Sequence, residues 1–274
     1  MAVALLFGCD FSSAPTTRKP IVIAQGALDG DVVSLEQLHT FATLDAWGEW
    51  LASLPAWVGG FDFPFGLPRA LVEQLGWPSE WPASMAHYAG LSRAEIRAEF
   101  AAFCAARPAG EKFAHRATDG PARSSPSMKW VNPPVALMLH AGVPRLLAAG
   151  ARLPAHDALT DTEATRIALE AYPGLLAREL IGRRSYKADD RARQTLERRA
   201  ARADLLDALR TPGSARLGIR LALEAPQRSA LLEDAQGDRL DAVLCLVQTA
   251  WASVRPGWGL PTGVDPLEGW IVSA

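Results

Sequence analysis

Cysteine is scarce in this 274-residue sequence, and long hydrophobic runs are absent from it. The chain has three cysteines, an odd number at wide spacing in apolar settings: Cys9, Cys104 and Cys245. This pattern excludes a CxxC-type zinc site and favours buried free thiols in a reducing compartment. No apolar run approaches the roughly 20 residues that span a bilayer, and the first residues lack the basic region of a secretory signal. We therefore expect a cytoplasmic protein without a membrane partner.

Neither sign of charge is in large excess, and histidine is rare. The formal net charge is −2, so no overall basic field points to a nucleic-acid partner, although a local basic patch can still bind one. The five histidines are scattered, without the HxxxH or HxH spacing that is typical of zinc sites. Apolar residues make up 49% of the chain, enough for the sizeable core of a globular protein. The composition leaves the oligomeric state open.

Five segments have the composition of β-strands, and their order predicts a mixed sheet. They are residues 3–12, 21–28, 32–41, 57–68 and 164–173. Short turns join the first three segments, which predicts an antiparallel meander. The fourth strand is expected to terminate at Pro64 and the fifth at Pro173, because proline cannot donate to a strand ladder. We expect one α/β domain over residues 1–274.

Helical periodicity marks several segments between and after these strands. The expected helices are residues 43–54 with Thr43 as N-cap, 91–106 with a Ser92–Glu95 capping box, 189–210 and 238–254. Residues 69–160 predict a helical and loop insertion between the fourth and fifth strands. Within it, segment 107–134 is typical of a long functional or mobile loop. Its polar residues suit a loop over a site, or surface solubility: Arg116, Asp119, Arg123, Ser127 and Lys129.

Four places along the chain carry acids that packing alone does not require. Asp10 lies in the first strand, Asp62 lies in the motif GFDFPFG, and Glu170 lies near the end of the fifth strand. Asp238 and Asp241 begin the last helix, three residues apart and therefore on one side of it. Ligands of α/β sheets usually bind at such strand ends. Converging carboxylates with no matching lysine repel one another unless a divalent cation neutralises them, and Mg²⁺ or Mn²⁺ favours carboxylate oxygens.

Three of these acids also have a purely structural interpretation. Asp10 can bond nearby backbone in a turn, and Asp238 can interact favourably with the helix macrodipole. Glu170 can pair with Arg178 or Arg183. The joint placement of the acids, rather than any one of them, favours a site.

Segment 178–202 differs in charge from the rest of the chain, with nine basic residues against four acids. It suits either a solvated helix face with paired charges or a patch that contacts phosphates. For direct substrate contact we expect Lys187 and Arg184, and we expect Tyr172 to stack on a base or sugar. Ser12 lies two residues beyond the first-strand acid on the same side, where it can bond a phosphate or a metal-bound water.

Short motifs follow one another in a fairly specific order. They are GCDFSSAPTTRKP, GFDFPFGLP, LEAYP, the Tyr186-Lys187 pair, DRLDAVLCLVQTAW and the terminal GWI at 269–271. From Gly8 to about Ile271, they resemble the domain-of-unknown-function family 429, regarded as predicted nucleases of the ribonuclease H-like superfamily. The resemblance implies a five-stranded mixed sheet, three antiparallel strands and then two parallel ones, with helices on both faces.

The resemblance also implies how the acids meet. The first and fourth strands are neighbours in that fold, which would place Asp10 beside Asp62. The last acid of the superfamily comes from the C-terminal helix and matches Asp241, with Asp238 as its companion. Glu170 is a feature of this group rather than of the characterised ribonucleases H or resolvases.

Together these features predict a metal-dependent nuclease or phosphodiesterase, a hydrolase with a possible nucleic-acid partner. The expected catalytic residues are Asp10, Asp62, Glu170 and Asp241. The expected ligands of one or two Mg²⁺ (or Mn²⁺) ions are Asp10, Asp62, Asp238 and Asp241, with Glu170 as an additional or supporting ligand. Metal-activated water would attack the phosphorus, and a second ion would stabilise the leaving oxygen.

Two other functions stay open. An actin-like kinase or ATPase has the same fold and an acid followed by hydroxyls in its first strand. Such proteins duplicate the domain and add Gly-rich nucleotide loops, and neither feature is visible here. The other is a catalytically inactive nucleic-acid-binding protein of this fold, which would bind nucleic acid without needing Mg²⁺.

Overall fold

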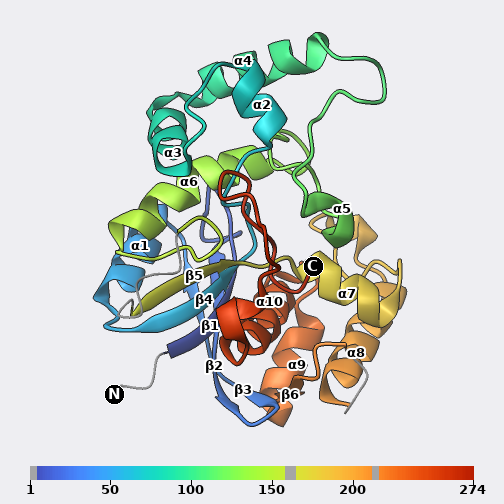
Figure 1. Ribbon diagram of the computed structural model, residues 1–274. Helices are drawn as coiled ribbons and strands as arrows, with labels where there is room; N and C mark the ends of the chain where they lie inside the picture. Colours follow the sequence, from blue (N-terminus) through green and yellow to red (C-terminus); the bar gives the residue numbers. More distant parts are fainter. Residues whose placement is uncertain (1–4, 158–164, 212–215) are drawn as a thin grey trace.

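A six-stranded mixed β-sheet forms the centre of the part of the molecule that the structure describes (Figure 1). The computed structural model describes residues 5–157, 165–211 and 216–274. The strands are β1 (Leu5–Asp10), β2 (Ile21–Asp29), β3 (Val32–Phe41), β4 (Trp57–Phe61), β5 (Arg166–Glu170) and β6 (Arg220–Ala222). Their order across the sheet is β5-β4-β1-β2-β3-β6, so β1 lies between β4 and β2.

The strand directions follow the sequence prediction, with one strand added. β1 pairs antiparallel with β2, and β2 with β3, whereas β4 is parallel to both β1 and β5. The predicted meander and the predicted neighbours, the first and fourth strands, are confirmed. The predicted count of five strands was wrong, because β6 pairs parallel with β3. With three residues and one buried side chain, β6 is too short to show an alternating pattern in the sequence.

Three of the described strands are shorter than predicted, whereas β2 and β3 have nearly the predicted bounds. β1 ends at Asp10, β4 at Phe61 and β5 at Glu170, so each acid or acid-bearing motif lies where its strand stops. Some residues assigned to strands or to the insertion lie outside the described residues, namely 3–4, 158–160 and 164. The terminal GWI contributes a single parallel bridge from Ile271 to Glu170 rather than a strand.

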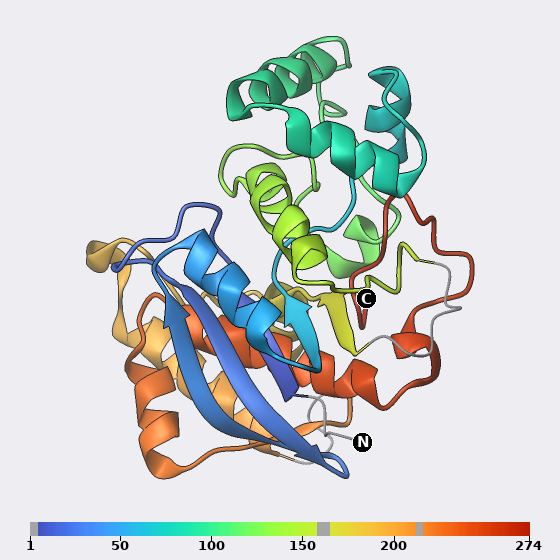
Figure 2. The same cartoon turned by 90° about the vertical axis from the view of Figure 1, so that its left-hand side faces the viewer.

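Helices cover both faces of the sheet (Figure 2). They are α1 (Leu44–Ser53), α2 (Arg69–Gln74), α3 (Trp81–Gly90), α4 (Arg93–Ala105), α5 (Asp119–Ala122), α6 (Val135–Ala148), α7 (Pro173–Ile181), α8 (Leu196–Arg210), α9 (Ala225–Glu233) and α10 (Asp238–Ser253). Helices α1 and α6 share one hydrophobic core with the sheet, and α2, α3 and α4 extend this core away from it. Helices α7 to α10 form the second core on the opposite face. No helix among the described residues is long and apolar enough to cross a membrane.

The pleat of β1 divides its side chains between these two cores. Phe7 and Cys9 pack on the side of α1, and Leu6 packs on the side of α10. Gly8 lies under α10, where an added Cβ would come within 2.1 Å of the backbone nitrogen of Leu246. Because side chains alternate along a strand, the even-numbered residues of β1, including its last, face α10.

Glycine recurs at the matching position of β4. Gly60 pairs in register with Gly8, and a Cβ there would lie 2.1 Å from the hydroxyl of Thr249 in α10. The two glycines let the backbone of α10 approach the sheet more closely than any side chain would allow. This close contact sets the height of the helix above the strand ends.

Several local predictions are confirmed and one needs correction. Thr43 caps α1 by accepting a hydrogen bond from the amide of Ala46, and Ser92 and Glu95 form the capping box of α4. The three cysteines are free and buried, as expected. In segment 107–134, however, Arg116, Asp119 and Ser127 are buried rather than surface groups, so solubility does not explain them.

Substitution of the β1 glycine tests this packing. Gly8→Ala places a methyl group against helix backbone that cannot move aside locally, so we expect it to lower the free energy of unfolding by about 1–3 kcal/mol or more. Gly90→Ala is the matched control, because no atom lies within 4 Å of its new Cβ. Urea unfolding of both variants measures the difference, and equal stability of Gly8→Ala and wild type would contradict the close contact.

Candidate metal centre

Three carboxylates from separate elements meet at the carboxyl ends of β1 and β4. Asp10 is the last residue of β1, Asp62 directly follows β4, and Asp241 lies in the first turn of α10. One carboxylate oxygen of each residue lies within 4.8 Å of those of the other two. Asp241 is fully buried, whereas Asp10 and Asp62 are half-buried. These residues, termed here the carboxylate triad, have the oxygen donors that Mg²⁺ and Mn²⁺ prefer.

The strand pleat directs two members of the triad to the same face. Asp10 and Asp62 each lie two residues beyond a glycine that contacts α10, so both point toward that helix. The backbone amide of Asp62 donates to the carbonyl of Cys9 (2.9 Å), which extends the β1–β4 ladder past the end of β4. The helix then supplies Asp241 from its amino-terminal turn. The triad therefore follows from strand pairing and from the position of one helix.

Asp241 has two further partners from the segment before α8. The hydroxyl of Tyr186 donates to its Oδ1 atom (2.5 Å), and the ammonium group of Lys187 donates to its Oδ2 atom. The expectation that the acids have no matching lysine is wrong, because Lys187 forms an ion pair with Asp241. Lys187 had been assigned to the substrate, whereas the structure places its ammonium group on the triad. A carboxylate has about four lone-pair sites, so Asp241 still has acceptor capacity for a cation.

Burial and repulsion between neighbouring charges raise the pKa of two members of the triad, Asp10 and Asp62. Burial raises the pKa of Asp10 well above its ordinary value, and the negative charges of Asp241 and Asp238 raise it further. Burial, together with the charge of Asp241, raises the pKa of Asp62 to about 7. Lys187 opposes both rises. A divalent cation would replace these protons and relieve the repulsion, so the residues present fit such an ion.

Asp238 lies next to the triad without belonging to it. It is the first residue of α10 and is mostly buried, and burial raises its pKa to about 6. Lys19, from the loop between β1 and β2, acts on it electrostatically and opposes that rise. The role of Asp238 as a metal ligand stays a prediction.

Glu170 faces the opposite side of the sheet from the triad. Its neighbours Leu169 and Ala171 enter the core under α10, and Ala168 enters the other core, so alternation directs Glu170 away from α10. Its carboxylate is engaged by Arg116 through two hydrogen bonds (2.7 and 2.8 Å) and by the backbone amide of Phe65 (3.1 Å). Its partners are thus other residues than the two arginines considered from the sequence, and Arg178 donates to the backbone carbonyl of Ala122. These contacts make Glu170 a tether between β5 and the insertion.

Arg116 has a larger structural role than the sequence indicated. Its side chain is 2% exposed and that of Glu170 is 4% exposed, so this ion pair is almost dry. Arg116 also donates to Asp119 and to the backbone carbonyl of Glu268, which joins the insertion to the C-terminal segment. Removing one partner of a buried pair typically costs about 3–5 kcal/mol, because the other charge is left without a partner. The short spacing between Arg116 and Asp119 was the feature of the sequence that could have indicated these buried ion pairs.

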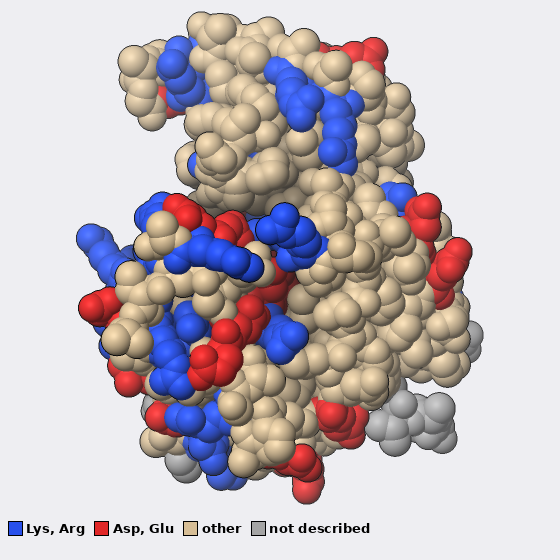
Figure 3. Space-filling model, turned by 180° about the vertical axis from the view of Figure 1, so that it is seen from behind, with Lys and Arg blue, Asp and Glu red and all other residues tan. Residues whose placement is uncertain are grey.

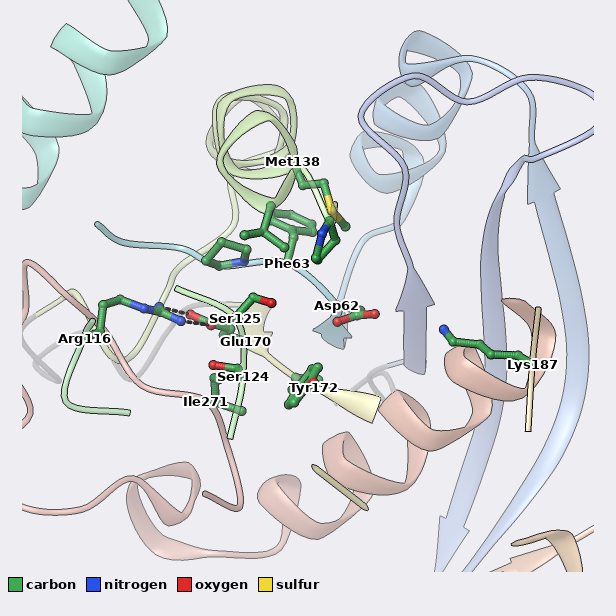
Figure 4. A pocket seen from close by; sticks show the side chains of 14 residues that line it. Asp62, Phe63, Arg116, Ser124, Ser125, Met138, Glu170, Tyr172, Lys187 and Ile271 are labelled. Carbon is green, nitrogen blue, oxygen red and sulfur yellow. Dashed lines mark hydrogen bonds and ion pairs between the residues drawn. The ribbon is translucent and has the colours of Figure 1, made fainter. Parts of the chain in front are cut away.

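A cavity of about 210 Å³ opens beside the triad (Figure 4). Asp62 and Lys187 line it at one side and the Arg116–Glu170 pair at the other. The remaining lining groups are mostly apolar or hydroxyl-bearing: Phe63, Pro64, Ser124, Ser125, Pro133, Val135, Met138, Ala171, Tyr172 and Ile271. The insertion therefore builds a wall of the space next to the carboxylates.

A second cavity of about 280 Å³ shares Asp62, Tyr172 and Lys187 with the first. Three arginines are among its other lining residues: Arg178, Arg183 and Arg184. Figure 3 shows that basic and acidic side chains gather together on the face below the hollow between the upper helices and the sheet. The carboxylates are thus flanked by cations of the kind that bind phosphate.

The other predicted substrate residues have varied surroundings. Tyr172 precedes α7 and lines both cavities, and its backbone amide donates to the side chain of Gln248. Arg184 forms an exposed ion pair with Asp204 (2.5 Å). The hydroxyl of Ser12 accepts a hydrogen bond from the amide of Ala14 (3.3 Å), the structural role of a turn residue. Their contacts with a substrate stay predictions.

The comparison with known families agrees with the motifs. The chain belongs to the family described as "Protein of unknown function (DUF429)", whose family model matches residues 8–260. This range includes the whole carboxylate triad and all of α10. No curated protein and no solved structure matches the chain.

The raised pKa of Asp62 makes the stability of the metal-free protein depend on pH. The pKa of an aspartate in an unfolded chain is about 3.9, whereas that of folded Asp62 is about 7. The folded state therefore binds more protons between these values, and the contribution of Asp62 is lost as the pH rises through the folded pKa. We expect the free energy of unfolding of wild type, relative to Asp62→Asn, to fall by up to about 3 kcal/mol between about pH 5 and pH 8.

Urea unfolding in the presence of a chelator measures this difference. Asp45→Asn is the matched control, because Asp45 is exposed on α1 and pairs only with Arg145. Added Mn²⁺ should stabilise wild type more at the higher pH, where protons compete less for the carboxylates. A difference between wild type and Asp62→Asn that does not change with pH would contradict the raised pKa.

Proposed function

We propose that this protein is a metal-dependent nuclease or phosphodiesterase of the ribonuclease H-like superfamily. The observation that carries the proposal is the carboxylate triad, whose oxygens lie within 4.8 Å of one another at the ends of two adjacent parallel strands. Strand order supports it as well. An antiparallel meander, two parallel strands and a last acid from the C-terminal helix form the arrangement that the sequence resemblance implies.

Asp10, Asp62 and Asp241 would hold the divalent cation, Mg²⁺ or Mn²⁺. Such an ion lowers the pKa of a water molecule and withdraws charge from a phosphate oxygen. The chain's own part is to fix three carboxylates in a partly dry site, where β1, β4 and α10 hold them before the substrate arrives. Tyr186 orients one oxygen of Asp241 through its hydroxyl.

The surroundings of the triad suit a phosphodiester. Lys187 lines both cavities, and the three arginines that line the larger one can bind non-bridging oxygens of flanking phosphates. Tyr172 lies between the two cavities with an aromatic ring that can stack on a base or sugar. The whole chain has a net charge of −2, so any attraction of nucleic acid would come from this local group of basic residues.

Loss of one triad carboxylate is expected to abolish hydrolysis. Asp10→Asn and Asp241→Asn each keep the side-chain size but remove a negative ligand. Even residues that only support metal ligands typically cost 10–100-fold, so we expect each variant to lose more than about 100-fold in activity. The assay uses single-stranded, double-stranded and branched DNA and RNA with Mg²⁺ or Mn²⁺, and Asp45→Asn is the control that should remain active.

Two results would contradict the proposal. The first is hydrolysis by Asp10→Asn or Asp241→Asn at the wild-type rate. The second is a wild-type protein that cleaves nothing and binds nucleic acid equally with Mg²⁺ and with a chelator, the behaviour of an inactive binding protein. Tight ATP binding or ATP turnover in the same preparations would favour the actin-like alternative.

A further inference from the structure

Lys187 occupies a position among carboxylates where a metal ion would be expected. Its ammonium group donates to Asp241, and its charge also acts on Asp10 and Asp62. Figure 4 shows its ammonium group pointing toward Asp62. The side chain is 42% exposed, so it reaches the triad from the solvent side rather than from within the core.

The backbone that carries Lys187 is anchored by helix α8. The guanidinium group of Arg202, itself buried, donates to the carbonyl of Tyr186 (2.7 Å), and that of Arg198 donates to the carbonyl of Lys187 (2.7 Å). Gly237, which precedes α10, has a φ of 80°, and a Cβ there would lie 2.7 Å from the Cβ of Lys187. Lys187 is therefore held against the start of α10 by several independent contacts.

Charge balance limits how many ions this arrangement accepts. The triad has three negative charges when ionised, and Lys187 neutralises one of them, while Lys19 acts on the charge of the neighbouring Asp238. The two that remain match one divalent cation. A second divalent cation beside the first and beside Lys187 would leave an excess of positive charge in a site of low dielectric constant, which is unfavourable.

Ligands for a second ion are also few. Within the described residues, the triad is the one group of three or more acidic, histidine or cysteine side chains close enough to hold a metal. Glu170, the additional ligand expected from the sequence, faces the other side of the sheet, and Arg116 and the amide of Phe65 engage its carboxylate. Asp238 alone would be a poor anchor for a separate ion.

We propose that Lys187 takes the place of a second divalent cation, so that the centre binds a single metal ion. This inference rests on the proposed function, since it concerns the same centre. Lys187 would then provide the positive charge that a second ion provides elsewhere, and its ammonium group, which lines both cavities, lies where it can contact the substrate phosphate.

The number of bound ions tests this directly. Native mass spectrometry with Mn²⁺ counts them, and electron paramagnetic resonance detects the coupling of two Mn²⁺ ions about 3.5–4 Å apart. We expect one ion for wild type, and two coupled ions for Lys187→Met, which removes the charge and keeps the chain length. Lys187→Arg keeps the charge and should bind one ion.

A matched control separates local replacement from general electrostatics. Lys19→Met removes a positive charge that acts on Asp10 and Asp238, but Lys19 pairs with Asp189 and not with the triad. It should bind one ion, as wild type does. Circular dichroism of each variant establishes that it is folded, and Lys187→Gln replaces Lys187→Met if the latter is not.

Each outcome has a distinct meaning. Two ions in wild type, or a single ion in the folded uncharged variant, would overturn the role of Lys187 and leave the proposed function intact. An absence of Mn²⁺ binding in wild type at saturating concentration would overturn the metal centre itself, and with it both proposals.

Discussion

The backbone contact between α10 and the two central parallel strands is the constraint on which the site depends. Gly8 and Gly60 lie side by side in β1 and β4 and leave no side chain between sheet and helix. The next residues on that face are Asp10 and Asp62, and the helix that rests on the glycines carries Asp241. Raising α10 by the height of one methyl group would therefore displace a ligand as well as loosen the core.

The same contact brings three like charges close together, and other residues of the chain neutralise part of that charge. Three carboxylates withdrawn from water repel one another, and burial raises the pKa of Asp10 and Asp62. Tyr186 and Lys187 offset this on Asp241, and helix α8 holds both residues in position through Arg198 and Arg202. What remains is a deficit of positive charge, which is the physical reason for expecting a cation.

The sequence alone predicted the part of the site that depends on periodicity. Asp10 and Asp62 were identifiable because each acid stands where an apolar strand ends, and Asp241 because it lies inside an amphipathic helix beside its apolar face.

The sequence did not show that Glu170 faces the other side of the sheet. The strand RIALE has three apolar residues in a row and no polar–apolar alternation, so which face meets which helix depends on contacts far away in the chain. Its partner Arg116 is 54 positions away, and a long-range ion pair has no local pattern. The contact of Lys187 with the triad is also long-range, so the sequence suggested a substrate contact for this residue instead. The strand β6 was too short to show a strand pattern in the sequence.

The central claim is that Asp10, Asp62 and Asp241 bind a divalent cation. Anomalous X-ray diffraction from crystals soaked in Mn²⁺ tests it most directly, because the signal locates the ion independently of any activity. We predict an anomalous peak about 2.1 Å from a carboxylate oxygen of each of the three residues. A peak elsewhere, or none at saturating Mn²⁺, would contradict the account.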